Sequence, residues 1–157
     1  FIFCSDHWAQ PHNKTIRIDE VESFRIPIII FDPMNPAGKR DSSVVSQLDV
    51  LNTMMYYAAV KEPFISYGQN LADSSLPFNR TVYSKLNSAV YQAINNQYVL
   101  GFDAIDGKAL YLYDYKKDPA KKTNLLKGQT PKEGNAMILS IKAFLQTASK
   151  HYKNELR

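Results

Sequence analysis

The sequence of 157 residues predicts an α/β chain in which pieces of a sheet are followed by a small antiparallel sheet and a C-terminal helix. Residues 1–4 and 26–31 are apolar without alternation, which is typical of strands covered on both faces, as in parallel sheets. Asp106-Gly107 is a strong hairpin signal. Residues 135–152 place apolar side chains at helical spacing.

The first part of the chain should begin with a buried strand over residues 1–4, in which Cys4 would be an inert interior thiol. A polar loop without periodicity follows over residues 5–23, and a loop of that length in a compact domain tends to carry function. Residues 26–31 form the second strand, which we expect to run parallel to the first.

A helix is expected in the stretch that starts at Ser46. Ser46 and Asp49 form an approximate capping box, and Pro63 should end the helix. Two parallel strands and one helix cannot cover both faces of a sheet, so this part should pack against strands that lie outside the sequence. The predicted apolar face of the helix consists of Leu48, Leu51, Met54, Met55 and Ala58.

The second part of the chain reads as neighbouring antiparallel strands over residues 88–94, 97–103 and 108–115. Tyrosines alternate along the last of these strands, and we expect them to pack across strands beneath the terminal helix rather than to form a stacking platform. The predicted organisation is therefore a partial α/β catalytic core over residues 1–66 and an antiparallel subdomain over residues 67–157.

Composition excludes some classes of protein. The net charge of +4 is mild, and its lysines flank turns and a helix end, so we expect no nucleic-acid partner. No apolar run approaches the roughly 20 residues of a membrane helix. A single cysteine excludes an internal disulfide.

The most suggestive residues for chemistry directly follow the first predicted strand. Asp6 and His7 stand where ligand sites collect in α/β sheets, and a carboxylate with a neutral imidazole suits Zn²⁺ or Mn²⁺. His12 and Asn13 follow in the same loop and could reach the same cleft. An Asp-His pair that bonds only to itself and to water is the alternative without a metal.

Four segments, taken in order, resemble the sulfatase and alkaline phosphatase superfamily. In that family a strand ends in Ser-Asp-His, a loop leads to Arg-Val-Pro plus aliphatics, a helix carries an Asp and a Pro-Thr, and a tail carries Leu-Tyr-Asp-Leu. Asn52 replaces the usual proline of the helix. The matching residues here are Ser5-Asp6-His7, Arg25-Ile26-Pro27, Asp49 with Asn52 and Thr53, Leu112-Tyr113-Asp114-Tyr115, Asp118-Pro119 and Asn124-Leu125.

Within the superfamily, Asp6-His7-Trp8 followed by His12-Asn13 is similar to the lipoteichoic acid synthase group of phosphoglycerol transferases. The resemblance implies a divalent metal, Mn²⁺ or Zn²⁺ with Mg²⁺ or Ca²⁺ as alternatives, bound by Asp6 and His7. It also implies that His12 and Asn13 contact a phosphoglycerol-bearing lipid or glycan.

The resemblance further implies that a threonine nucleophile and the remaining metal ligands come from a missing N-terminal portion of the same protein. No catalytic residue is assignable within this chain, and we expect the fragment alone to show no turnover. The intact protein would act outside the cytoplasm or in the periplasm, anchored in the membrane through segments before Phe1.

Three alternatives stay open. A sulfatase or a phosphoethanolamine transferase is the nearest within enzymes, although the sulfatase Cys-x-Pro-x-Arg signature is absent because Cys4 is followed by Ser5-Asp6-His7. From another class, the chain could be a non-catalytic scaffold or binding module that retains the fold.

Overall fold

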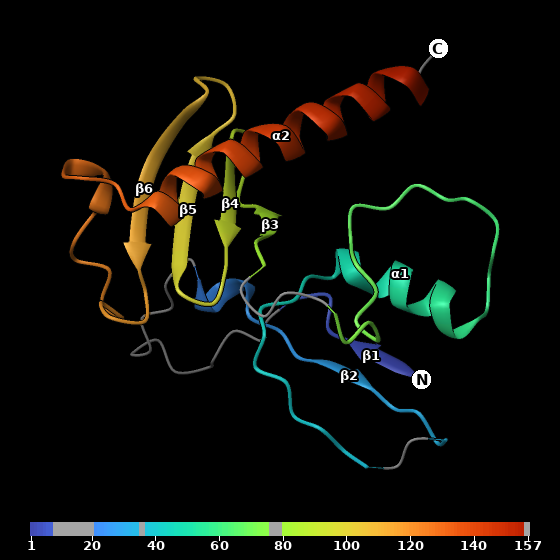
Figure 1. Ribbon diagram of the computed structural model, residues 1–157. Coiled ribbons are helices and arrows are strands. Elements are labelled where there is room, and N and C mark those ends of the chain that lie inside the picture. Colours follow the sequence, from blue (N-terminus) through green and yellow to red (C-terminus); the bar gives the residue numbers. More distant parts are fainter. Residues whose placement is uncertain (8–20, 35–36, 76–79, 156–157) are drawn as a thin grey trace. The chain divides into compact units, whose positions relative to one another are not determined.

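The computed structural model describes residues 1–7, 21–34, 37–75 and 80–155 (Figure 1). The chain forms two compact units: unit 1, Phe1–Leu76, and unit 2, Pro77–Arg157. The division lies after residue 76, whereas the sequence pattern places it after residue 66. Residues 67–71 stay with the first unit because they bond to its helix.

The first unit contains a two-stranded sheet of β1 (Ile2–Cys4) and β2 (Ile28–Ile30). The strands pair antiparallel, with Phe3 opposite Ile29, so the prediction that they run parallel is wrong. A continuous apolar run indicates that both faces of a strand are to be covered. It does not determine the direction in which the strand runs relative to its neighbour. A 3₁₀ turn, η1 (Glu22–Phe24), precedes β2.

The prediction that the first strand is buried is also wrong. Phe3 is 58% exposed, and the Cys4 thiol is exposed rather than interior. Apolar composition predicts that a strand will be covered, but it does not say that the covering element belongs to the same chain.

Helix α1 (Leu48–Tyr57) begins where the capping box predicts. The Ser46 Oγ accepts a hydrogen bond from Leu48 N at 3.3 Å, and Asp49 Oδ2 accepts one from Ser46 N at 2.7 Å. The helix ends well before Pro63, through Ala59 in a left-handed conformation with φ 52°. The predicted apolar face is largely exposed, whereas Asp49 and Thr53 are the buried residues of the helix.

The second unit is a four-stranded antiparallel sheet in the order β3-β4-β5-β6. The three predicted strands and the terminal helix are confirmed, while β3 gave no sequence signal because it is short and half polar. The bounds are β3 Val82–Lys85, β4 Val90–Ile94, β5 Tyr98–Asp103, β6 Lys108–Asp114, a 3₁₀ turn η2 Leu125–Lys127, and α2 Lys132–Glu155.

Helix α2 runs across one face of this sheet (Figure 1) and completes the core of the unit. Leu100, Leu112 and Ile141 are each fully buried there. Gly107, with φ 67°, closes the β5–β6 hairpin as the Asp-Gly signal predicts. Within the described residues, no helix has the length and apolarity needed to cross a bilayer.

The tyrosines of β6 do not pack beneath α2, contrary to the prediction. Leu112 belongs to the core under the helix, and side chains alternate along a strand, so Tyr111 and Tyr113 face the other way. Their rings stack on each other with centroids 5.3 Å apart.

Candidate metal-binding site

Asp6 and His7 follow β1 directly, and their side chains are 90% and 79% exposed. The backbone N–H of His7 donates to Asp6 Oδ1 at 2.9 Å, which holds the carboxylate over the turn. Asp6 Oδ1 and His7 Nε2 lie 3.7 Å apart. Two ligands of one tetrahedral zinc ion stand about 3.4 Å apart at ordinary bond lengths, so this spacing is close to that of a shared ion.

A glutamine that the sequence patterns did not single out ties this turn to α1. The Gln47 side-chain amide donates from Nε2 to the carbonyl oxygens of Ser5 at 2.7 Å and Asp6 at 3.2 Å. The end of β1 is therefore fastened to the start of α1. No local signal could reveal this bond, because its partners lie far apart in the sequence.

Asp49 and Thr53, which match the helix motif of the family, are buried within unit 1 and bond to backbone. Asp49 Oδ1 accepts from Gln69 N at 2.8 Å, and Thr53 Oγ1 accepts from Leu71 N at 3.0 Å. Thr53 also donates to Asp49 O at 2.8 Å. The buried polar groups of Asp49 and Thr53 are thus satisfied, and both residues hold the adjoining loop against α1.

The same loop approaches the first turn of α1 at Gly68. Asn52 Nδ2 donates to Gly68 O at 2.8 Å. A Cβ at Gly68 would lie 1.9 Å from Leu48 O, a backbone atom that cannot move aside. Glycine is therefore required for this close approach.

The tail motif in unit 2 also bonds to backbone. Asp114 Oδ1 accepts from Lys116 N at 3.2 Å and Lys117 N at 2.9 Å, while its Oδ2 accepts from Gln97 Nε2 at 2.8 Å. Burial alone would raise the pKa of Asp114. The hydrogen bonds from the Gln97 side chain and from the backbone N–H groups of Lys116 and Lys117 outweigh the effect of burial and hold the pKa below its usual value. Asp118 Oδ2 accepts from Thr123 N in the following turn.

Asn124 completes this arrangement. Its Oδ1 accepts from Leu112 N and Leu126 N, both at 3.1 Å, and its Nδ2 donates to Leu110 O at 3.3 Å. The motif residues thereby join η2 to β6. Asp114, Asp118 and Asn124 of the tail motif therefore hold the turns that follow β6 in place.

The candidate site offers two ligands in the described residues. Within the ranges that the structure describes, no group of three histidine, cysteine or acidic side chains could hold a metal. A protein metal site of this kind uses about four ligands, so a metal held by Asp6 and His7 would need about two more than the described residues offer. His12 and Asn13, the predicted substrate-binding residues, lie outside the described residues.

No family model matches the chain. The sequence is similar to arylsulfatase K of Xenopus laevis, with 28% identity over 180 aligned residues that cover 98% of this chain and 33% of the relative. The chain therefore spans about a third of the length of that relative. This similarity supports a relationship to the sulfatase-like superfamily, and the narrower resemblance to the lipoteichoic acid synthase group does not follow from it.

Proposed function

We propose that this chain supplies Asp6 and His7 as two ligands of a divalent metal in a sulfatase-like enzyme that cleaves or transfers an ester. The observation that carries the proposal is the pair itself: an exposed carboxylate and an exposed imidazole, 3.7 Å apart, at the end of a strand. The similarity to a sulfatase gives this pair a chemical context.

The donor set fits Mn²⁺ or Zn²⁺ best, with Mg²⁺ or Ca²⁺ as alternatives. A bound ion would neutralise the oxygens of the ester and lower the pKa of the attacking group. Asp6 would supply negative charge and His7 a nitrogen ligand. Because an imidazole binds metal only in its neutral form, metal affinity should fall in acid.

Two substrate classes remain, each favoured by one observation. The relative's name favours a sulfate ester. The pattern Asp6-His7-Trp8 with His12-Asn13 favours phosphoglycerol transfer, in which His12 and Asn13 would contact a phosphoglycerol-bearing lipid or glycan. In both cases the nucleophile and the remaining metal ligands would come from an N-terminal portion of the same protein. The chain alone should therefore have no turnover. The intact protein would act outside the cytoplasm.

The test uses the full-length translation product that contains this chain. Zn²⁺ and Mn²⁺ affinity would be measured by calorimetry, and activity with 4-nitrophenyl sulfate and bis(4-nitrophenyl) phosphate. Asp6→Asn and His7→Gln should each lower metal affinity by about tenfold or more. The control His151→Gln changes a histidine of α2 in unit 2 and should leave metal affinity unchanged.

Unchanged metal affinity in both site variants would refute the proposal. A full-length protein without a tight metal site would instead support the non-catalytic scaffold. Preference for the sulfate ester would identify a sulfatase, and preference for the phosphodiester would identify a phosphotransferase or phosphodiesterase.

A further inference from the structure

Charge is divided unequally between the two units. Unit 1 carries six basic and nine acidic residues, a net charge of −3, whereas unit 2 carries thirteen basic and six acidic residues, a net charge of +7. The mild net charge of +4 is thus the sum of a moderately acidic unit and a strongly basic one. Charge of one sign on one part of a protein attracts partners of the opposite sign.

Four exposed lysines of unit 2 lie close together in the sequence, between the end of β6 and the end of η2. They are Lys116, Lys117, Lys122 and Lys127, and we call them the basic edge. The segment of residues 115–128 that carries them contains one acidic residue, Asp118. Within the described part of the chain, none of the four lysines forms an ion pair with a carboxylate.

The backbone that carries these lysines is fixed by hydrogen bonds. Two turns follow each other after β6, and they are closed by Asp118 N to Asp114 O at 2.8 Å and by Lys121 N to Asp118 O at 2.9 Å. The carboxylates of Asp114 and Asp118 accept hydrogen bonds from backbone N–H groups that follow them. Asn124 bonds the returning chain to β6. The lysines therefore project from a framework that is already formed, so only their own side chains lose freedom on binding.

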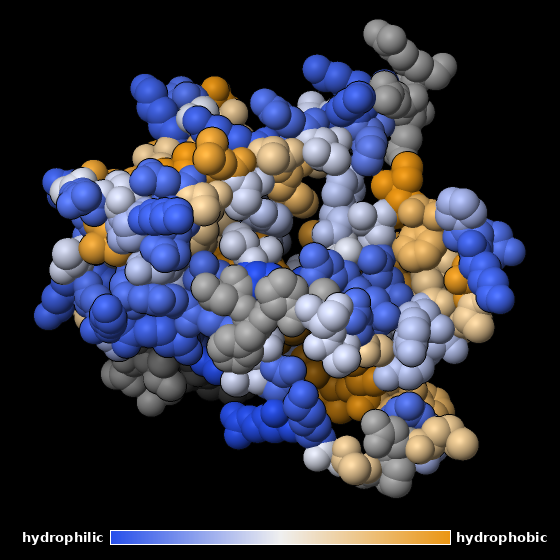
Figure 2. Space-filling model, in the orientation of Figure 1, coloured by the Kyte–Doolittle hydropathy of each residue, from blue (hydrophilic) through white to orange (hydrophobic). Residues whose placement is uncertain are grey.

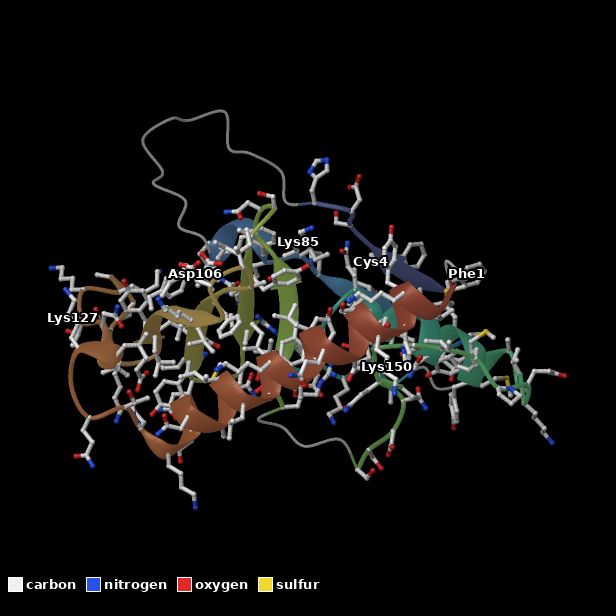
Figure 3. All side chains as sticks on the ribbon, turned by 90° about the horizontal axis from the view of Figure 1, so that it is seen from above. Phe1, Cys4, Lys85, Asp106, Lys127 and Lys150 are labelled. Carbon is white, nitrogen blue, oxygen red and sulfur yellow. The ribbon has the colours of Figure 1, made fainter. Side chains whose placement is uncertain are left out.

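The basic edge lies on the outer side of unit 2. Figure 1 shows the segment after β6 returning beside that strand, which is the last strand of the sheet. Figure 2 shows hydrophilic residues over the turns after β6, at the lower left of the view. In Figure 3, the labelled Lys127 lies well away from Lys150 of α2. The lysines of the basic edge thus stand at one side of the unit, separate from those at the end of α2.

The basic edge offers positive charge without an aromatic surface on which a ligand could stack. Tyr115 is the aromatic residue of the segment, and its hydroxyl donates to Asn95 O. Its ring is also occupied, because Lys116 Nζ lies 5.3 Å from the ring centroid. Proteins that bind single-stranded nucleic acid combine positive charge with aromatic side chains that stack on the bases. The chemistry of the basic edge is instead suited to bare anionic groups.

We propose that the basic edge is a contact surface for a membrane that contains anionic phospholipids. Clusters of four or more lysines are attracted to anionic headgroups, and each lysine close to such a membrane strengthens binding by about fivefold. Anionic lipids diffuse within a fluid bilayer, so a headgroup can reach each lysine wherever the fold places it. A soluble polyanion would instead have to match the spacing of the lysines along its own chain.

This contact is electrostatic and involves no insertion of apolar side chains. Leu125 and Leu126, the two leucines of the segment, pack against the core of unit 2. The contact is also independent of the proposed metal site, because Asp6 and His7 belong to unit 1. Attraction between exposed charges is screened by salt, so the contact should be sensitive to ionic strength.

The experiment measures co-sedimentation of the chain of residues 1–157 with phosphatidylcholine vesicles that contain or lack phosphatidylglycerol. Binding to the vesicles without phosphatidylglycerol should be at least about tenfold weaker than binding to those with it. At 1 M salt, where the Debye length is about 3 Å, binding to the anionic vesicles should be lost.

Two charge-matched double variants test whether the basic edge is responsible. Lys117→Gln with Lys122→Gln should weaken binding to anionic vesicles by about tenfold or more. Lys150→Gln with Lys153→Gln removes two charges from exposed residues of α2 and should weaken binding by less than about threefold, because these charges lie away from the contact. Lys117→Arg with Lys122→Arg keeps the charge and should retain binding. Far-UV circular dichroism checks that each variant is folded.

Several outcomes would overturn the inference. These are no binding to anionic vesicles at low salt, equal binding to neutral vesicles, binding that persists at 1 M salt, and equal losses in the two glutamine double variants. Binding to dextran sulfate or duplex DNA without binding to anionic vesicles would also overturn it, and would assign the basic edge to a soluble polyanion.

Discussion

Gln47 is the residue that connects the candidate metal site to helix α1. Its Nε2 donates to the backbone carbonyl oxygens of Ser5 and Asp6. Asp6 is the first predicted metal ligand, and Ser5 is the residue before it. We therefore assign it a positioning role. Gln47→Glu preserves shape but directs a carboxylate at two carbonyl oxygens, so it should be more harmful than Gln47→Ala.

In the full-length protein, Gln47→Glu should weaken Zn²⁺ binding by about tenfold, as removal of outer-shell partners does in other metal sites. Calorimetry measures this affinity, and thermal unfolding shows whether the fold is retained. Gln69→Ala is the control, because Gln69 bonds to Asp49 through its backbone N–H, which the substitution retains. Equal affinities in Gln47→Glu and the control would show that Gln47 is not a positioning residue.

Asp114 predicts how the stability of unit 2 depends on pH. Its pKa is held below the unfolded value, so the folded state binds fewer protons in the acid range, and the stabilisation it provides is present above about pH 4. That stabilisation is lost as the pH falls through the lowered pKa. Asp114→Asn should therefore reduce stability by about 1–2 kcal/mol at pH 7 and by less at pH 2.5.

Urea unfolding of the two proteins at both pH values measures this difference. Asp106→Asn in the β5–β6 turn is the matched control, because Asp106 is an exposed residue. A difference between Asp114→Asn and the parent that persists undiminished at pH 2.5 would contradict the assignment.

At the scale of elements, the attachment of residues 67–71 to α1 depends on Gly68. A methyl group there would lie 1.9 Å from Leu48 O, so the loop must move away from the helix. Gly68→Ala should therefore break the bonds from Gln69 N to Asp49 and from Leu71 N to Thr53. Amide exchange at Gln69 and Leu71 should become at least about tenfold faster.

Gly38→Ala is the control for this prediction, because a Cβ at Gly38 meets no atom within 4 Å. It lies in the same unit and should leave exchange at Gln69 and Leu71 unchanged. If Gly68→Ala behaves in the same way as Gly38→Ala, the loop is not held against α1 in solution.

The elements also show which features were predictable. The Ser46–Asp49 capping box and the Asp106-Gly107 turn are local, so their residue types alone determine them. The direction of β2 relative to β1 depends on a partner strand far along the chain, and apolarity is silent on it. In the same way, Asp6 and His7 stand out as neighbours in the sequence, whereas Gln47 joins them only through the fold.

At the scale of the whole molecule, the two units differ in what holds them together. Unit 2 has a conventional core between α2 and its sheet. Unit 1 is joined by polar bonds around Asp49 and Thr53, while fourteen of its large apolar side chains are exposed. The helix and tail motif residues bond to backbone groups, as Asp49 does in unit 1 and Asp114 in unit 2, whereas the side chains of the Asp6-His7 pair are 90% and 79% exposed.

This difference predicts that truncation of an apolar side chain to alanine lowers stability much more in α2 than in α1. Ile141 in α2 is fully buried, so Ile141→Ala should cost about 2–5 kcal/mol because it leaves a cavity. Leu51 in α1 is 44% exposed, and Leu51→Ala in the chain of residues 1–157 should change stability by no more than about 0.5 kcal/mol. Urea unfolding followed by far-UV circular dichroism measures both values. A cost for Leu51→Ala as large as that for Ile141→Ala would show that unit 1 buries a core of its own.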